Sequence, residues 1–326
     1  MADYKTLKGY KVASLASDPT VNKGQLWYNT ASNTLKYDGV GAAAWASGAS
    51  VSVAVETGMS FGTSTSAILV GGMTESPAVA QNTSFSYNGT AWTEEATIDT
   101  ARRWGGGLGA SATAGLIVGG SPPSMALTEV YNGTSWTEVN PINRNVESVA
   151  GSGGTVTAGL CAGGEPGPGI QVETWDGTNW TEITDLNAAH NTAAATAFGS
   201  PTAFQVAGGA PSYKATSEQW NGTAWTEVGD LNVAVYGNGG AGTTTSMISY
   251  GGIKSPAVVV GTTEQWNGTS WTEIADLSQA RLYMAVYNGT GTAALAISGR
   301  GNPTPNYVNV EAWDNEPDGV KTVTTS

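Results

Sequence analysis

The chain has 326 residues, a net charge of −13 and only 12% charged residues, with 45 Gly and 12 Trp. This acidic balance argues against sequence-independent binding to a phosphate backbone, which depends on Lys and Arg. No apolar run reaches the roughly 18 residues of a membrane span. A single Cys cannot build a disulfide framework. We therefore expect no nucleic-acid partner, no membrane insertion and no intrachain disulfide.

Residues 1–50 differ from the rest of the chain. Their start lacks the apolar h-region of a signal peptide. Two short alternating runs, at residues 24–29 and 34–39, flank an Asn/Ser turn, which is the pattern of a β-hairpin. We expect residues 1–50 to form an N-terminal attachment segment. Residues 24–46 either begin a seventh repeat or supply a strand that closes a ring.

One stretch with two aromatics around a turn occurs five times after residue 50. Its first copy is Tyr87-Asn-Gly-Thr-Ala-Trp92-Thr-Glu94. The second aromatic recurs after 44, 44, 45 and 46 residues, at Trp92, Trp136, Trp180, Trp225 and Trp271. Such regular spacing indicates one supersecondary unit that is repeated.

Each unit shows the same order of features, which predicts four strands. An Ala/Gly-rich run comes first, because innermost strands of a radial array leave no room for large side chains. An apolar run follows, typical of a strand buried on both faces, and ends in a glycine pair where the backbone bends. These pairs are Gly71-Gly72, Gly119-Gly120, Gly163-Gly164, Gly208-Gly209 and Gly251-Gly252, with Gly299-Arg300-Gly301 as an altered sixth instance. A Pro-containing loop, a strand ending in an aromatic, an Asn-Gly turn with positive φ values and a Trp-Thr-Glu strand complete the unit.

Four antiparallel strands that only a neighbouring unit can cover describe a β-propeller blade. We expect an all-β fold, with a propeller over residues 51–326 whose six blades start near residues 51, 101, 144, 190, 234 and 281. The last unit lacks the short turn, and residues 320–325 are expected to serve as its fourth strand. Six complete blades are favoured, and residues 24–46 leave a seventh open.

The repeat resembles the kelch repeat of β-propeller proteins. The likeness rests on the glycine pair, on Glu129-Val-Tyr131-Asn132 followed by Trp136, and on the close Leu277-Ser-Gln-Ala-Arg281. The turn is shorter than in the kelch pattern, and His190 and Val235 stand where other units have Arg. The resemblance implies a kelch-like propeller, and it leaves the chemistry open because fold is not function.

A second resemblance concerns the N-terminal segment. Gly24-Gln-Leu-Trp-Tyr-Asn-Thr30, followed by Leu35-Lys-Tyr-Asp-Gly39, is similar to segments of tail-fibre and other virion proteins of tailed, especially marine, bacteriophages. This resemblance implies a virion protein assembled in the host cytoplasm. Its N-terminal segment would bind other virion proteins, its propeller would be displayed, and it would be multimeric in the particle.

The reactive side chains are too few for most enzymes built on this fold. One His cannot form a multi-His metal site. We interpret Cys161 as a buried strand residue and His190 as structural. Two series of carboxylates recur in successive units, as in Glu129 and Glu138, and we interpret a repeated Glu as a structural cross-strand partner. We expect no enzymatic activity, no metal and no cofactor.

The loops between the second and third strands vary most among the units, and each contains Pro, which reduces loop entropy. Rigid loops on a scaffold are common recognition sites. We expect contacts to come from Tyr213, Lys214, Lys254, Arg300 and Tyr307. The function these observations favour is a non-enzymatic virion structural or host-recognition protein, a tail fibre, appendage or decoration protein that meets a host surface glycan or receptor. The alternative is a carbohydrate-binding kelch-type lectin unconnected with a virus.

Overall fold

A computed structural model describes residues 6–7, 10–19, 26–39, 43–75, 77–196, 199–285, 288–301, 305–315 and 319–322. Strands, turns and loops make up this part of the chain, and none of it is a helix that is long and apolar enough to cross a membrane. The chain divides into two compact units, residues 44–314 and a small unit of residues 1–43 with 315–326. The sequence predicted a different division, at residue 50.

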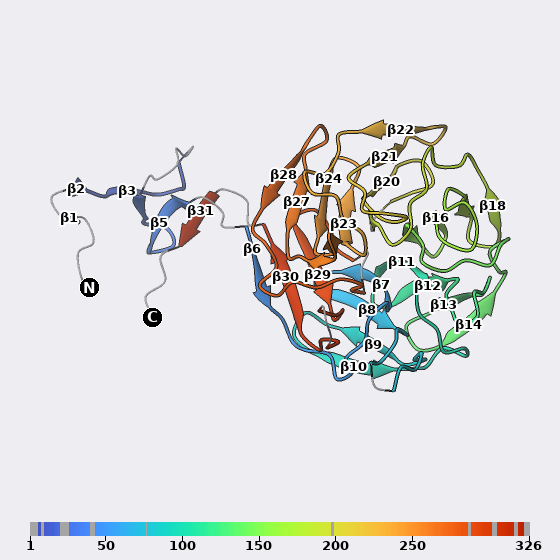
Figure 1. The fold of residues 1–326 in the computed structure, drawn as a ribbon. Helices are drawn as coiled ribbons and strands as arrows, with labels where there is room; N and C mark the ends of the chain where they lie inside the picture. The colour runs from blue at the N-terminus through green and yellow to red at the C-terminus, as the bar shows by residue number, and fades with distance from the viewer. Residues whose placement is uncertain are drawn as a thin grey trace. The chain divides into compact units, whose positions relative to one another are not determined.

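Residues 44–314 form a β-propeller in which antiparallel sheets, the blades, surround a common centre (Figure 1). Blade 1 contains β7 (Met59–Thr63), β8 (Ser66–Val70), β9 (Ser84–Tyr87) and β10 (Trp92–Glu95). Blade 2 contains β11 (Gly106–Ser111), β12 (Ala114–Val118), β13 (Thr128–Tyr131) and β14 (Trp136–Val139). Blade 3 contains β15 (Gly151–Thr155), β16 (Ala158–Ala162), β17 (Val172–Trp175) and β18 (Trp180–Glu182).

The remaining blades follow the same order from the centre outward. Blade 4 contains β19 (Ala194–Ala195), β20 (Phe204–Ala207), β21 (Ser217–Trp220) and β22 (Trp225–Val228). Blade 5 contains β23 (Gly239–Thr243), β24 (Ser246–Tyr250), β27 (Thr263–Trp266) and β28 (Trp271–Ile274), and its loop carries the small hairpin β25 (Ile253–Lys254) and β26 (Val258–Val259). Blade 6 contains β29 (Ala293–Ile297), β30 (Val310–Asp314) and β6 (Ala44–Ser47), and bridges from Ala285 and Gly289 extend it inward. The predicted fold class, a kelch-like β-propeller with six blades, is confirmed.

The sixth blade is closed by the N-terminal strand β6. It pairs antiparallel with β30, so that Trp45 lies opposite Trp313. The prediction that residues 320–325 supply this strand is wrong, because β31 (Gly319–Thr322) pairs with β5 (Thr34–Gly39) in the small unit. Residues 26–39 also belong to that unit and form no seventh blade.

Small residues line the centre because neighbouring inner strands come into direct backbone contact. A Cβ on Gly107 of β11 would lie 2.2 Å from the Ser60 carbonyl oxygen of β7. One on Gly240 of β23 would lie 2.5 Å from the backbone nitrogen of Ala195 in β19. No side chain fits at such distances, which explains the Gly/Ala-rich first strands.

Aromatic pairs hold the outer hairpins together, as the sequence predicted. The two rings that flank each turn lie opposite each other in the β-ladder, with centroids 4.9 Å apart for Tyr131 and Trp136. In blade 6, Trp45 and Trp313 form the equivalent pair from opposite ends of the chain, with centroids 5.5 Å apart. The second aromatic also reaches the preceding blade through its indole nitrogen. Examples are the bonds from Trp136 to Ser84 Oγ (3.4 Å), Trp180 to Thr128 Oγ1 (3.0 Å) and Trp45 to Thr263 Oγ1 (3.0 Å). Trp45 therefore plays the same part as the five repeated tryptophans.

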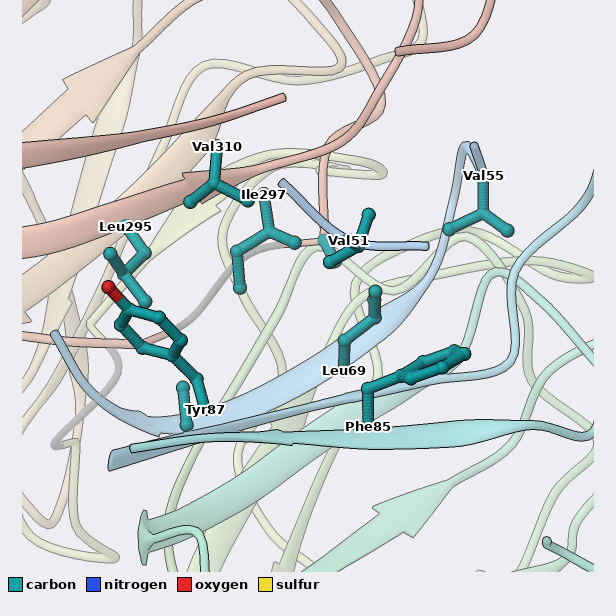
Figure 2. Packing of buried hydrophobic residues seen from close by; sticks show 10 residues of the cluster. Val51, Val55, Leu69, Phe85, Tyr87, Leu295, Ile297 and Val310 are labelled. Atoms are coloured by element: carbon teal, nitrogen blue, oxygen red, sulfur yellow. The ribbon is translucent and has the colours of Figure 1, made fainter. Parts of the chain in front are cut away.

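Apolar side chains fill the spaces between adjacent blades. Figure 2 shows Leu295, Ile297 and Val310 of blade 6 packed toward Leu69 and Phe85 of blade 1. Similar clusters lie between blades 1 and 2, 2 and 3, and 4 and 5. Cys161 is fully buried in one of them, and burial raises the pKa of its thiol to about 12, as expected for a structural cysteine.

The Asn-Gly turn works differently from the prediction. Only the glycine has positive φ, for example +95° at Gly133. The asparagine acts through its side chain, since Asn132 Oδ1 accepts the backbone N–H groups of Thr134 and Ser135, both at 3.0 Å. Each turn is therefore a four-residue loop held by an Asx interaction.

The recurring glutamates of the third strand anchor the connections that enter blades 2 to 6. Glu129 pairs with buried Arg102 at 2.5 Å, and Glu311 pairs with buried Arg281 at 2.6 Å. The cross-strand neighbour of Glu129 is the exposed Glu138. This series has the structural role that the sequence predicted, but its partners are groups of the connection and not side chains of the paired strand.

Blades 3, 4 and 5 use other residues for this anchor. In blade 5, Val235 stands at the position of the arginine, and Asn232 Nδ2 donates to Glu264 Oε2 at 2.8 Å. His190 is fully buried, with Nδ1 2.6 Å from the Gly208 carbonyl oxygen and Nε2 3.4 Å from Glu218 Oε1. Its predicted structural role is confirmed. In blade 3 the corresponding residue is Val146, and Arg144, two positions earlier, donates to the Gly163 carbonyl oxygen at 2.7 Å.

The small unit contains a four-stranded sheet in the order β3 (Ala13–Leu15), β4 (Leu26–Asn29), β5 and β31, and a separate pair, β1 (Thr6–Leu7) with β2 (Tyr10–Lys11). The predicted hairpin is present as the antiparallel β4–β5 pair. Trp27 is fully buried, and Asp18 Oδ1 accepts a hydrogen bond from its indole nitrogen at 3.2 Å.

Candidate functional site

One end of the propeller carries all the variable loops. In antiparallel blades, the loops between strands two and three leave from the same end as the connections that enter the next blade. Isolated bridges join the two kinds of segment within a blade, as in Glu56 with Met73, Arg103 with Ser121 and Leu282 with Arg300. We call this end the loop face.

A ring of six residues with left-handed backbone surrounds the axis at the loop face. Each stands just before the first strand of its blade, and φ lies between +47° and +66°. The members of this mouth ring are Thr57, Trp104, Ser148, Thr192, Gly237 and Tyr283. Residues other than glycine seldom adopt this conformation, and such strain clusters at functional sites.

Backbone hydrogen bonds run around the mouth ring from blade to blade. Thr57 N–H donates to the Tyr283 carbonyl at 2.7 Å, and Trp104 N–H donates to the Thr57 carbonyl at 3.0 Å. Further bonds join Thr192 to Ser148, Gly237 to Thr192 and Tyr283 to Gly237. The closed circle of blades thus fixes the backbone, while the side chains of the ring differ.

The mouth ring lines an open depression of about 40 Å³. Its floor consists of the residues that follow the ring in each blade, including Val149, Ala193, Asn238 and Met284. This volume holds only a few water molecules, so a larger ligand would lie over the mouth ring.

Four half-buried aromatic rings form a continuous cluster beside the depression. Trp104 and Tyr283 meet edge to face with centroids 4.7 Å apart. The ring centroid of Tyr236 lies 6.3 Å from that of Tyr283 and 5.3 Å from that of Tyr213. Gly237 makes room for this cluster, because a Cβ there would lie 2.8 Å from Tyr283 Cε1. Burial, with Tyr236 close by, raises the pKa of Tyr283.

Charged side chains contact two of the aromatic rings, those of Trp104 and Tyr283. Arg300 Nε lies 3.0 Å from Glu56 Oε2, and its guanidinium lies 5.2 Å from the Tyr283 ring centroid. The Arg103 guanidinium lies 5.9 Å from the Trp104 centroid. Burial raises the pKa of Glu56; Arg300 and Arg103 oppose the shift, and Glu75 adds to it.

The opposite side of the depression is polar and uncharged. The hydroxyls of Ser148 and Thr192 are half-buried and have no side-chain partner among the described residues. Asn238, only 3% exposed, bonds through Nδ2 to Ser249 Oγ at 2.9 Å, while its Oδ1 has no hydrogen-bond partner within the described chain. Unsatisfied buried acceptors are rare in native proteins and call for an explanation.

The predicted contact residues all lie on the loop face, and two of them join the aromatic cluster. Tyr213 stacks on Tyr236, and Arg300 lies over Tyr283. Lys214 contacts the connection that enters blade 4, because its Nζ donates a hydrogen bond to the Ala189 carbonyl oxygen. Burial lowers the pKa of Lys214. Lys254 lies half-buried in the β25–β26 hairpin.

Tyr307, the fifth predicted residue, lines a separate hollow with Gln279 and Val258, and its ring lies 5.5 Å from the Arg281 guanidinium. The sixth glycine pair was also misplaced by the sequence. Ser298 and Gly299 have the positive φ values of the pair, so Arg300 is the bridging residue that follows it.

Sequence reasoning missed the most prominent side chains of the mouth, Trp104, Tyr236 and Tyr283. They stand in the connections between blades, which were treated as the start of an Ala/Gly-rich strand. One available signal was their position, because Trp104 and Tyr283 each follow by two residues an arginine that closes a repeat, Arg102 and Arg281.

The arrangement suits non-covalent recognition. Within the described residues no three His, Cys, Asp or Glu side chains gather to hold a metal ion. Both His190 and Cys161 are buried in the frame, away from the mouth ring. Ring faces and hydroxyls are groups that bind and orient a ligand.

The sheets and their order place the chain in the β-propeller class. No protein-family model matches the sequence, and no curated protein matches it. Among solved structures, that of YjhT is similar, with 12% sequence identity, a TM-score of 0.66, and coverage of 84% of this chain and 99% of that chain. At this identity, the likeness shows the fold alone.

Proposed function

We propose that the chain is a non-enzymatic recognition protein of a tailed-phage virion, attached through its small unit and meeting a host surface glycan or receptor with the loop face. The observation that carries the recognition role is the mouth ring: its backbone is the same in all six blades, whereas its side chains differ. The constant backbone is part of the propeller scaffold, whereas recognition of a ligand depends on the side chains that the scaffold presents.

The virion part of the proposal rests on the N-terminal segment. Residues 24–39, which resemble tail-fibre segments, belong to the small unit, so attachment and recognition are assigned to different units. Within the particle we expect several copies, held by other virion proteins.

Immunogold labelling of purified virions, with antibodies raised against the full chain, tests the attachment. We expect gold on intact particles; unlabelled particles would remove the virion assignment. Competition tests recognition, because the purified chain should reduce adsorption of virions to host cells. A Glu56→Gln variant addresses enzymology: hydrolysis of a glycan by the wild-type chain and its loss in this variant would contradict the non-enzymatic assignment.

A glycan-binding lectin without a virion is the second candidate, favoured by the exposed parts of Trp104, Tyr283, Tyr236 and Tyr213. Aromatic rings with one apolar face and a polar edge are suited to amphipathic ligands. Binding on a glycan array, combined with the absence of the chain from virions, would favour this lectin.

A further inference from the structure

We propose that the mouth ring binds one uncharged pyranose unit, the terminal sugar of a glycan, with its C–H face on Trp104 and Tyr283 and its hydroxyls toward Ser148 and Thr192. This inference rests on the proposed recognition function and names its ligand class and its site.

The aromatic side of the depression supplies the apolar contact. Trp104 and Tyr283 come from blades 2 and 6 and meet above Thr57, which lies between them in the mouth ring. Because the faces of aromatic rings carry negative charge, they attract the weakly positive C–H groups of a sugar ring. Tyr236 and Tyr213 continue the wall outward, where a second sugar of the same glycan would lie.

The opposite side supplies hydrogen bonds. Ser148 and Thr192 belong to consecutive members of the mouth ring, and the Thr192 N–H bond to the Ser148 carbonyl holds them side by side at 3.1 Å. Both hydroxyls are free to donate or accept. A ring with one apolar face and a hydroxyl-bearing edge matches these two sides.

The charges argue for a neutral sugar. Glu56 is surrounded by Arg300, Arg103 and Glu75, so two positive charges are balanced by two negative ones. Arg300 is engaged with Glu56 at 3.0 Å and stacked on Tyr283. Glu147 and Glu165, on the blade 3 side of the loop face, add negative charge and disfavour an anionic ligand.

The test measures binding of sugars to the full-length chain by saturation-transfer NMR and titration. Methyl glycosides of glucose, galactose and mannose are the neutral probes, and methyl glucuronide is the acidic one. We expect at least one neutral probe to bind and the glucuronide to bind at least about tenfold more weakly, a difference of about 1.4 kcal/mol.

Three variants locate the site. Trp104→Ala and Tyr283→Ala should each weaken binding of the neutral probe about tenfold or more, while Tyr37→Ala should leave it unchanged, because Tyr37 is 40% exposed and lies in the small unit. Ser148→Ala should give a smaller loss, about threefold. Thermal melts confirm that each variant is folded, so that lost binding is not lost structure.

The outcomes separate this inference from the proposed function. Unchanged binding in both aromatic variants, preference for the glucuronide, or no binding of any sugar would each overturn the pyranose site. Labelled virions and competition with adsorption would then still support recognition of another receptor. Unlabelled virions with sugar binding lost in Trp104→Ala would instead remove the virion assignment and keep the site.

Discussion

The outer hairpins occur in five blades and the mouth ring in all six, yet the two repeat different things. In the hairpins the side chains recur: an aromatic pair, an asparagine that caps the turn, and an indole that binds the preceding blade. In the mouth ring the left-handed backbone recurs, while its residues change from glycine to tryptophan.

This difference separates the frame from the candidate site. A side chain that must fit the same neighbour in every blade cannot vary. A backbone fixed by blade-to-blade hydrogen bonds leaves the exposed side chain free to differ. We therefore expect binding at the mouth ring, where the backbone conformation is repeated and the side chains differ. The following substitutions and truncations test this contrast.

Loss of β6 should have the largest effect on the frame. A chain of residues 48–314 lacks the strand that pairs with β30 and lacks Trp45, so blade 6 loses its outer strand and its bond to Thr263. We expect no cooperative unfolding transition by circular dichroism. Residues 44–314, the compact unit with β6 retained, are the matched control and should melt cooperatively. Equal melting of the two chains would contradict the assigned closure.

Removing the buried cation Arg281 should cause the second largest loss of stability. Arg281→Ala leaves the buried Glu311 carboxylate without its partner at 2.6 Å, and breaking such a pair costs about 3–5 kcal/mol. Urea unfolding measures the loss. Arg281→His is the control that the chain itself suggests, since His190 has this role in blade 4, and its cost should be smaller. The same loss in both variants would show that the ion pair is not the important contact.

Replacing the glycine of an outer-hairpin turn should cause a smaller loss of stability. In Gly133→Ala, φ of +95° is strained for alanine, and the new Cβ would lie 3.1 Å from the Thr113 carbonyl oxygen. We expect a loss of about 1–2 kcal/mol. Ser135→Ala, in the same turn, should be neutral because other copies have alanine there, as at Ala91 and Ala224. Differential scanning calorimetry would resolve the two.

A substitution in the mouth ring should cause the smallest change in the free energy of unfolding, and this change should be a gain of stability. Thr192→Gly removes a β-branched residue from a left-handed backbone of φ +47°, and the relief exceeds the added entropy of the unfolded chain. We expect a gain of up to about 1 kcal/mol in urea unfolding. Thr181→Gly, on the exposed strand β18, should instead lose about 0.5–1 kcal/mol. A loss in Thr192→Gly would mean that the ring stores no strain.

Much of the frame could be predicted from the sequence because its rules are local. The Trp spacing, the Ala/Gly-rich runs and the aromatic–Asn-Gly–aromatic stretch each report a strand or a turn. The closing strand could not be predicted from such rules, because residues 44–47 and 319–322 both form strands. The interval from Trp45 to Trp92, 47 residues, is close to the repeat and distinguishes them in retrospect.

The mouth could not be predicted in the same way. Nothing in the residue types of Trp104 or Tyr283 indicates positive φ, since the conformation is imposed by hydrogen bonds that exist only when the blades close into a circle. Their proximity is likewise a property of the closed ring, because blades 2 and 6 are distant in sequence. The variable loops indicated the correct end of the propeller and two members of the aromatic cluster, Tyr213 and Arg300.

The pairing of Ala44 with Asp314 has a mechanical consequence. The backbone passes between the propeller and the small unit twice, at neighbouring points of blade 6, so a pull between the units is shared by two covalent strands. A single tether would let the propeller spin without limit. With two, each full rotation would wind one strand about the other, so torque as well as tension would pass between the two units.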